Sequence, residues 1–307
     1  MTQAQPTRYK RRRRVFILGG GATLGAHQVG ALKFLEEQGI RPDAIIGSSI
    51  GVINACVYCS GGVARLESAW RDFRSLQQVL RPSLTQNPVI GLSLFSMNGL
   101  SRALEAFIDF PRVFESEVEV AFVVLNLSRG RGEIYHRREL ADWRELRTIS
   151  RAGYAIPLLF PPVRFRDEFL VDGGFAWNIP LEYALEIGAN EIYILAPIPS
   201  QLPFQARLPS FVHLAGRFVD VMWRTIGNMG YLYARLEHGR FHGVPVTIIE
   251  PGEEFSGFRL LDLFHTYPAK SRRLMAAGYR DAKREWAARE RTSRVVARPT
   301  GGREEVA

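Results

Sequence analysis

The stretch Ile45–Cys59, IIGSSIGVINACVYC, joins the end of a β-branched segment to the start of an apolar helical pattern. The apolar residues after the junction recur on one side of a helix: Val52, Ala55, Cys56 and Cys59. The junction itself reads Gly47-Ser48-Ser49-Ile50-Gly51, a G-x-S-x-G sequence. Glycines on both sides permit a turn so tight that the central side chain projects from the end of the strand. Ser49 is therefore a candidate nucleophile, provided that another residue accepts its proton.

On both sides of this turn, apolar strands alternate with helical patterns, which predicts an α/β fold with a mainly parallel sheet. The first unit comprises a strand at Val15–Leu18, a glycine-rich turn at Gly19–Gly25, a helix at Ala26–Gln38 closed by Gly39, and a strand at Asp43–Ile46. Such a unit is right-handed, so both of its turns open at the same edge of the sheet. We therefore expect Ser49 to be a neighbour of the glycine loop.

Later segments extend the same pattern without an internal repeat, a low-complexity linker or a clear domain boundary. Further strands are expected at Glu119–Leu125, Glu133–Tyr135, Glu191–Leu195 and Val244–Ile249. Between Phe211 and Leu236, apolar residues at spacings of three and four predict an amphipathic helix or two. Its apolar side is expected to face the core rather than lipid.

Composition limits the class of protein. A chain of 307 residues with 46% hydrophobic residues can bury a sizeable core, which excludes general disorder. The 40 Lys and Arg against 31 Asp and Glu give a formal charge of +9, much of it in Lys10–Arg14 and from Arg272 onward. We expect solvated arms there, with a contact to anionic lipid or nucleic acid as the alternative. No stretch reaches the ~18 apolar residues of a membrane span, which predicts a soluble, cytoplasmic protein that is at most peripheral on membranes.

The two cysteines, Cys56 and Cys59, have the C-x-x-C spacing of redox pairs. A reactive pair needs a helix N-terminus that lowers the thiol pKa, but these residues lie about two turns inside the expected helix. We therefore interpret them as buried packing residues.

The glycine loop, Gly19–Gly25, fits neither common phosphate-binding template. The Rossmann spacing fails because Leu24 or Ala22 stands where a glycine belongs, and no Gly-Lys-Ser/Thr follows for a Walker loop. What remains is a loop whose backbone N–H groups can face a developing oxyanion, at Gly19, Gly20, Gly21 and Ala22. A purely structural tight turn is the alternative.

Two residues compete as the proton acceptor for Ser49. His265 follows the last expected strand, as in a Ser-Asp-His hydrolase, although such hydrolases commonly have several strands before the nucleophile and only two fit here. Asp172 ends a short apolar run in Phe169-Leu170-Val171-Asp172-Gly173-Gly174, where the glycines permit another sharp turn. Taken alone, it matches the common Asp-Gly turn equally well.

The motifs taken together resemble the patatin-like phospholipase family. Three blocks carry the resemblance: Gly19-Gly20-Gly21 through Gln28-Val29-Gly30, then Gly47-Ser48-Ser49-Ile50-Gly51, then Asp172-Gly173-Gly174 followed by Asn178-Ile179-Pro180. Lesser similarities lie at Ala155-Ile156-Pro157, Phe160-Pro161-Pro162 and Ala277-Gly278-Tyr279. The combination in this order is more specific than any single glycine motif. The resemblance runs from about Val15 to about Ala287.

The resemblance implies a three-layer α/β/α fold with the nucleophile elbow after the second strand. It also implies a Ser49–Asp172 dyad without histidine, with the glycine-loop amides as oxyanion hole. The implied substrates are lipid or other fatty acyl esters, with no metal and no cofactor. The chain then divides into a basic arm at 1–14, a lipid acyl hydrolase domain at 15–287 and a tail at 288–307.

One departure from the family pattern lies in the glycine loop. Leu24 stands where the family often has a basic residue, and Ala22 where it has its third glycine. This change leaves two alternatives to an active dyad enzyme: a catalytically weak lipid-binding or regulatory protein on the same fold, and a Ser-Asp-His hydrolase that uses His265. The sequence predicts no specific nucleic-acid partner.

Overall fold

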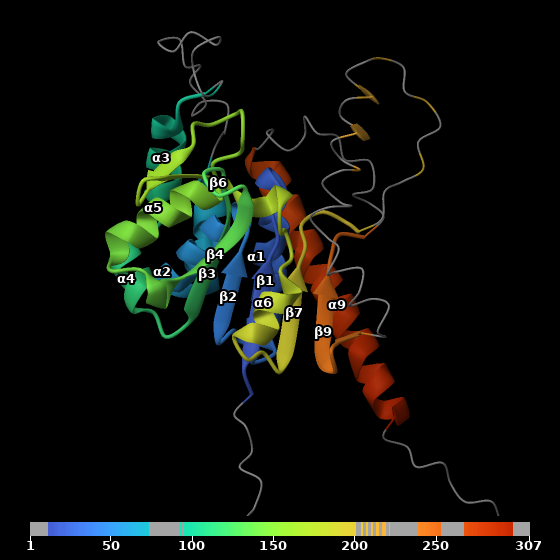
Figure 1. Ribbon diagram of the computed structural model, residues 1–307. Helices are drawn as coiled ribbons and strands as arrows, with labels where there is room; N and C mark the ends of the chain where they lie inside the picture. Colours follow the sequence, from blue (N-terminus) through green and yellow to red (C-terminus); the bar gives the residue numbers. More distant parts are fainter. Residues whose placement is uncertain are drawn as a thin grey trace, which may run out of the picture.

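The computed structural model describes residues 12–73, 95–200, 239–252 and 267–296, together with Ser93 and isolated positions between 204 and 221. A mixed sheet runs through the centre, with the strand order β5-β6-β3-β2-β1-β7-β9-β8 and with β4 paired to β3 (Figure 1). Its parallel strands are β3 (Glu119–Asn126), β2 (Ala44–Gly47), β1 (Arg14–Leu18), β7 (Glu191–Leu195) and β9 (Val244–Ile249). Antiparallel strands complete it: β4 (Arg131–His136), β5 (Val163–Phe165), β6 (Glu168–Asp172) and β8 (Arg240–Phe241).

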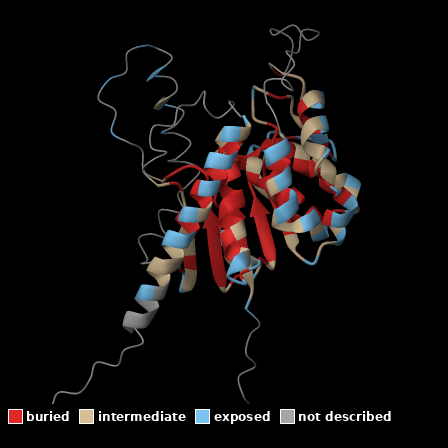
Figure 2. Ribbon diagram, turned by 180° about the vertical axis from the view of Figure 1, so that it is seen from behind, coloured by how far each residue is buried: buried red, intermediate tan, exposed pale blue. Residues whose placement is uncertain are grey.

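Helices cover both faces of the sheet, which gives three layers. Along β1, Phe16 and Leu18 face one apolar cluster, and Val15 and Ile17 face another. The first cluster includes residues of α1 (Ala26–Glu37), α2 (Ile50–Asp72), α3 (Met97–Glu105), α4 (Phe110–Glu115), α5 (Trp143–Gly153) and α9 (Pro268–Val296). The second includes residues of α6 (Leu181–Glu186). Seen from behind, the strands at the centre of the sheet are buried, while the helices alternate between buried and exposed residues (Figure 2).

The pairing along β3 brings two distant segments end to end. One edge of β3 is occupied by β4, which pairs from Ala121 to Asn126. The other edge pairs with β2 up to Phe122, opposite Gly47, and with β6 from Val124, opposite Asp172. Strand β6 therefore continues the position of β2 along the sheet. As a consequence, Asp172 lies just beyond the end of β2, where the chain turns into Ser48 and Ser49.

Helix α2 is broken at Gly61 and Gly62, where the backbone leaves helical geometry and Gly62 has a φ of 74°. A positive φ of this kind is readily adopted by glycine. The part after the break returns toward the first part, because the indole Nε1 of Trp70 donates a hydrogen bond of 2.8 Å to Asn54 Oδ1. Short helical turns elsewhere are η1 (Ala22–Gly25), η2 (Arg137–Glu139) and η3 (Gly173–Phe175).

The first β-α-β unit and the later strands are confirmed, with element ends shifted by one or two residues. Basic residues near both ends of the described fold are bonded to the sheet. Arg14 is the first residue of β1, and Arg13 and Arg14 form ion pairs with Glu119 and Glu191 respectively. Helix α9 continues to Val296, and Arg289 within it donates hydrogen bonds to Glu191 and to the Tyr193 hydroxyl.

Two further expectations have different outcomes. Cys56 and Cys59 are buried free thiols, as predicted, and burial raises the pKa of Cys59 to about 12, opposite to the change a reactive thiol needs.

The amphipathic segment predicted at 211–236 falls almost entirely outside the described residues. His265 also lies outside them. Among the helices of the described part, none is long and apolar enough to cross a bilayer.

Candidate active site

Ser49 stands at a strained turn between β2 and α2. Its φ of 53° and ψ of −122° are unfavourable for a residue with a Cβ, at a cost of roughly 1–3 kcal/mol. The turn is held by the Ser48 N–H, which donates a hydrogen bond of 3.0 Å to the Leu18 carbonyl. Both flanking glycines are required by space: a Cβ at Gly51 would lie 1.9 Å from Leu18 O, and one at Gly47 would lie 2.8 Å from Gly51 O. The strain is thus imposed by close packing of the turn on β1.

Asp172 is fully buried at the end of β6. Its Oδ1 accepts a hydrogen bond of 2.8 Å from the Gly174 N–H, which begins the short turn η3. Its Oδ2 has no hydrogen-bond partner in the described part of the chain. Gly173 is required here as well, because a Cβ would lie 2.6 Å from the backbone of β3 at Val123. A buried carboxyl oxygen without a partner is costly unless a further group pairs with it.

Burial raises the pKa of Asp172 from 3.8 to about 7, while the nearby Ser49 hydroxyl and the Gly174 amide lower it. The serine is thus close enough to act on the carboxyl group, although Oδ2 is not in a well-aligned hydrogen bond. Such loose geometry is common in the absence of substrate. A carboxylate with a pKa near 7 is a much better proton acceptor than an ordinary aspartate.

The glycine loop lies against the same edge of the sheet. The N–H of Gly19 donates to the Leu195 carbonyl at 3.2 Å, and the N–H of Gly20 donates to Asn178 Oδ1 at 2.5 Å. These two amides are therefore already used within the protein. The next residues differ: Gly21 is extended, with a φ of 163°, and Ala22 has a φ of 45°, a conformation that favours glycine.

A buried polar network fixes both ends of the loop. Gln28 Nε2 donates to the carbonyls of Gly19 at 2.8 Å and Leu195 at 2.9 Å. Asn54 Nδ2 donates to the Gly25 carbonyl at 3.0 Å and to Gln28 Oε1 at 2.7 Å. The sequence alone predicted no role for these side chains or for Asn178. The available signal was that Gln28 and Asn54 are amides within otherwise apolar helix faces.

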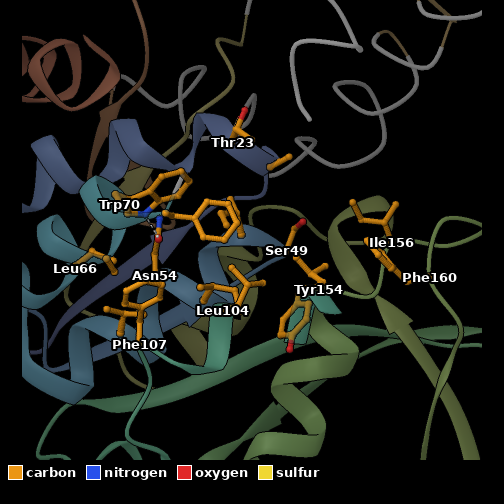
Figure 3. Close-up of a pocket in the computed structure, with 17 residues that line it drawn as sticks. Thr23, Ser49, Asn54, Leu66, Trp70, Leu104, Phe107, Tyr154, Ile156 and Phe160 are labelled. Carbon is orange, nitrogen blue, oxygen red and sulfur yellow. Dashed lines mark hydrogen bonds between the residues drawn. The ribbon is translucent and has the colours of Figure 1, made fainter. Parts of the chain in front are cut away.

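An apolar pocket adjoins Ser49 (Figure 3). It lies between the two parts of α2, helix α3 and residues 154–160, and Thr23 of the glycine loop also lines it. The polar groups of Asn54 and Trp70 in its wall are satisfied by each other and by the network described above. The pocket therefore offers an apolar surface that begins at the serine hydroxyl.

Within the described residues, no group of three or more His, Cys, Asp or Glu side chains is arranged to hold a metal ion. The buried pair of His27 and Asp281, with Nε2 and Oδ2 2.9 Å apart, instead joins α1 to α9.

The sheet, its covering helices and the turn at Ser49 define an α/β protein with a serine at a strained strand-to-helix turn, near a buried aspartate. The chain belongs to the patatin-like phospholipase family, whose family model matches residues 16–185. It is 27% identical over 180 residues to human patatin-like phospholipase domain-containing protein 6, covering 57% of this chain and 13% of that protein. It is 30% identical over 190 residues to lysophospholipase nte1 of Aspergillus niger, covering 58% of this chain and 11% of that protein.

The chain thus spans only a small part of the length of these relatives. Among solved structures, VipD from Legionella pneumophila aligns with a TM-score of 0.49 and 13% identity, covering 91% of this chain and 67% of that one.

Proposed function

We propose that the protein is a serine lipid acyl hydrolase that cleaves fatty acyl esters through a dyad of Ser49 and Asp172. The observation that carries this proposal is the position of Asp172. This residue is buried at the end of β6, and β6 and β2 pair with successive parts of β3, so Asp172 lies beside the strained serine. Its pKa is raised to about 7. In an aspartate that only forms a turn, burying a carboxyl oxygen without a hydrogen-bond partner would cost folding free energy and bring no benefit. Membership of the patatin-like phospholipase family supports the hydrolysis of lipid esters in general.

In the proposed reaction, Ser49 Oγ attacks the ester carbonyl while the Asp172 carboxylate takes its proton. The oxyanion accepts hydrogen bonds from backbone amides, which we place at Gly21 and Ala22 because those of Gly19 and Gly20 are already used. Asp172 then returns the proton to the leaving alcohol. Water releases the fatty acid from Ser49 by the same steps, so no metal or cofactor enters the chemistry.

The apolar pocket supports an acyl group as the part of the substrate next to the reacting carbonyl. The names of the relatives, a phospholipase and a lysophospholipase, favour phospholipid or lysophospholipid esters. The test is to incubate the purified protein with a panel of phospholipids, lysophospholipids and neutral esters and to measure the fatty acid released, with and without a chelator. Release that is unaffected by the chelator is expected. Lipid binding without release would instead favour the regulatory alternative.

His265 provides a test of the dyad against a Ser-Asp-His triad. We expect His265→Ala to reduce kcat/KM by less than about tenfold, because a general base contributes about 10²–10⁴-fold and no such role is assigned to this residue. The measurement is ester hydrolysis by the variant beside Asp172→Asn, with circular dichroism to verify that both are folded. Equal losses in the two variants would replace the dyad by the triad.

The basic N-terminal segment leads to a prediction about membranes. Replacing Lys10, Arg11 and Arg12 by Gln should weaken binding to phosphatidylserine vesicles at low salt by about a hundredfold, since each basic residue near an anionic surface contributes ~1 kcal/mol. Arg13 and Arg14 are left in place because they form ion pairs within the fold. Co-sedimentation measures the effect, and phosphatidylcholine vesicles are the control. Unchanged binding to the anionic vesicles would show that the segment has no part in membrane contact.

A further inference from the structure

The pocket beside Ser49 has a far end that is well separated from the serine. In Figure 3, Ser49, Ile156 and Phe160 lie toward one side, and Leu66, Trp70 and Phe107 lie toward the other. Leu66 is completely buried, and Phe107 is half-buried and follows the end of α3. The far end is thus built from the returning part of α2 and from the segment that leads to α4.

Two hydrogen-bonded contacts fix this end wall to α2. Arg65 Nε, beside Leu66, donates to the carbonyl of Phe107 at 2.9 Å. Before the break in α2, Ser60 Oγ accepts a hydrogen bond of 2.9 Å from the Asp109 N–H and itself donates to Cys56 O. The segment 107–109 is therefore attached to both parts of the broken helix. A wall held in this way resists displacement by a ligand better than a wall made of side-chain packing alone.

We propose that this pocket holds the acyl chain of the substrate and that the wall formed by Leu66 and Phe107 sets the longest chain that is hydrolysed efficiently. The inference rests on the proposed function and adds a determinant of substrate length. An acyl carbonyl placed at Ser49 can direct its chain into the apolar pocket that begins at this serine. Each methylene group that is buried in the pocket makes the free energy of binding more favourable. A methylene group that would extend beyond the wall adds no such contribution.

Substitutions at the wall test the inference in two directions. Phe107→Ala opens the far end, and Leu66→Phe fills part of it. With butyryl, octanoyl, dodecanoyl and hexadecanoyl esters of p-nitrophenol, we expect Phe107→Ala to raise the ratio of kcat/KM for hexadecanoyl to octanoyl about tenfold. Leu66→Phe is expected to lower that ratio by a similar factor.

The matched control is Phe114→Ala. Phe114 is also half-buried and packs against the same core cluster, but it does not line the pocket. The Phe114→Ala variant loses an equally large side chain but leaves the wall of the pocket unchanged. Its chain-length profile should therefore remain that of the wild type. An equal change in Phe114→Ala, or no change in either wall variant, would overturn the inference.

Binding without turnover gives a second measurement that does not depend on catalysis. Trp70 lines the pocket on the side away from Ser49, so a fatty acid brominated near its methyl end should quench its fluorescence more than one brominated near the carboxyl group. Trp70→Phe should remove this difference. Equal quenching by both acids would place the chain elsewhere.

The two proposals fail in distinguishable ways. If butyryl esters are hydrolysed and a fluorophosphonate labels Ser49, but the wall variants keep the wild-type length profile, the hydrolase proposal stands and the inference about the wall is wrong. If the brominated acids quench Trp70 in the expected order and no ester is hydrolysed, the chain site stands and the hydrolase proposal is wrong.

Discussion

Ser49→Ala is expected to remove both fluorophosphonate labelling and hydrolysis of medium-chain and long-chain acyl esters, to below the detection limit of each assay. The reason is chemical, since alanine has no oxygen to form the acyl intermediate. The variant is expected to fold, because the Ser49 side chain caps no helix and the turn is held by backbone contacts of Ser48 and Gly51. Mass spectrometry of the labelled peptide provides the measurement, and a fatty acid release assay accompanies it.

The neighbouring serine makes the comparison sharper. Ser48 Oγ is buried and has no hydrogen-bond partner among the described residues, whereas its backbone N–H supports the turn. Ser48→Ala should therefore retain labelling at residue 49. Labelling that survived Ser49→Ala but disappeared in Ser48→Ala would show that Ser48, and not Ser49, is the nucleophile.

The sequence alone predicted the parts of the site that follow from the glycine motifs and from the right-handedness of β-α-β connections. Ser49 and the glycine loop belong to a single β-α-β unit, so a right-handed connection is enough to place both turns at one edge of the sheet. The tight contacts of Gly47 and Gly51 likewise follow from the motif itself. Asp172 is different, because an Asp-Gly pair by itself is an ordinary turn.

The position of Asp172 comes from the sheet rather than from its own segment. It depends on β2 and β6 sharing one edge of β3, a pairing between residues far apart in the chain. No local pattern carries this information. The apolar run before Asp172 and the glycines after it made the residue a candidate, and the resemblance to a family favoured it over an ordinary turn. The same holds for Asn178, whose contact with Gly20 spans 158 positions.

The pocket was also outside the reach of sequence reasoning. Gly61 and Gly62 indicate a break in a helix, but not that the following turns come back beside the first ones. That return is stabilised by Trp70 and Asn54, a pair of side chains that only the folded chain brings together. Apolar spacing predicts that a helix face is buried, without distinguishing a filled core from the wall of a cavity.

Asp172→Asn is expected to lower kcat/KM by about 10²–10⁴-fold, since an amide cannot accept the serine proton. In the wild type, kcat/KM should rise with pH through a midpoint near the Asp172 pKa of about 7, because only the ionised carboxylate acts as base. The residual rate of the variant should lack this dependence. The measurements are pH profiles of both proteins with a short-chain ester. A wild-type profile that is flat from pH 5 to 9 would contradict the assignment of Asp172 as the base.

The same substitution should increase stability, with a pH dependence of definite sign. Between 3.8 and about 7, folded Asp172 retains a proton that the unfolded chain releases, so the free energy of unfolding of the wild type falls as pH rises and then levels off. The full cost corresponds to about 4 kcal/mol, an upper limit for the gain because the new amide must find its own partner. Asn cannot titrate, so thermal unfolding should favour the variant more at pH 8 than at pH 4.5. A variant less stable than the wild type at pH 8 would mean that the carboxylate is stabilised by its site, and a carboxylate stabilised in that way would be too weak a base for the proposed dyad.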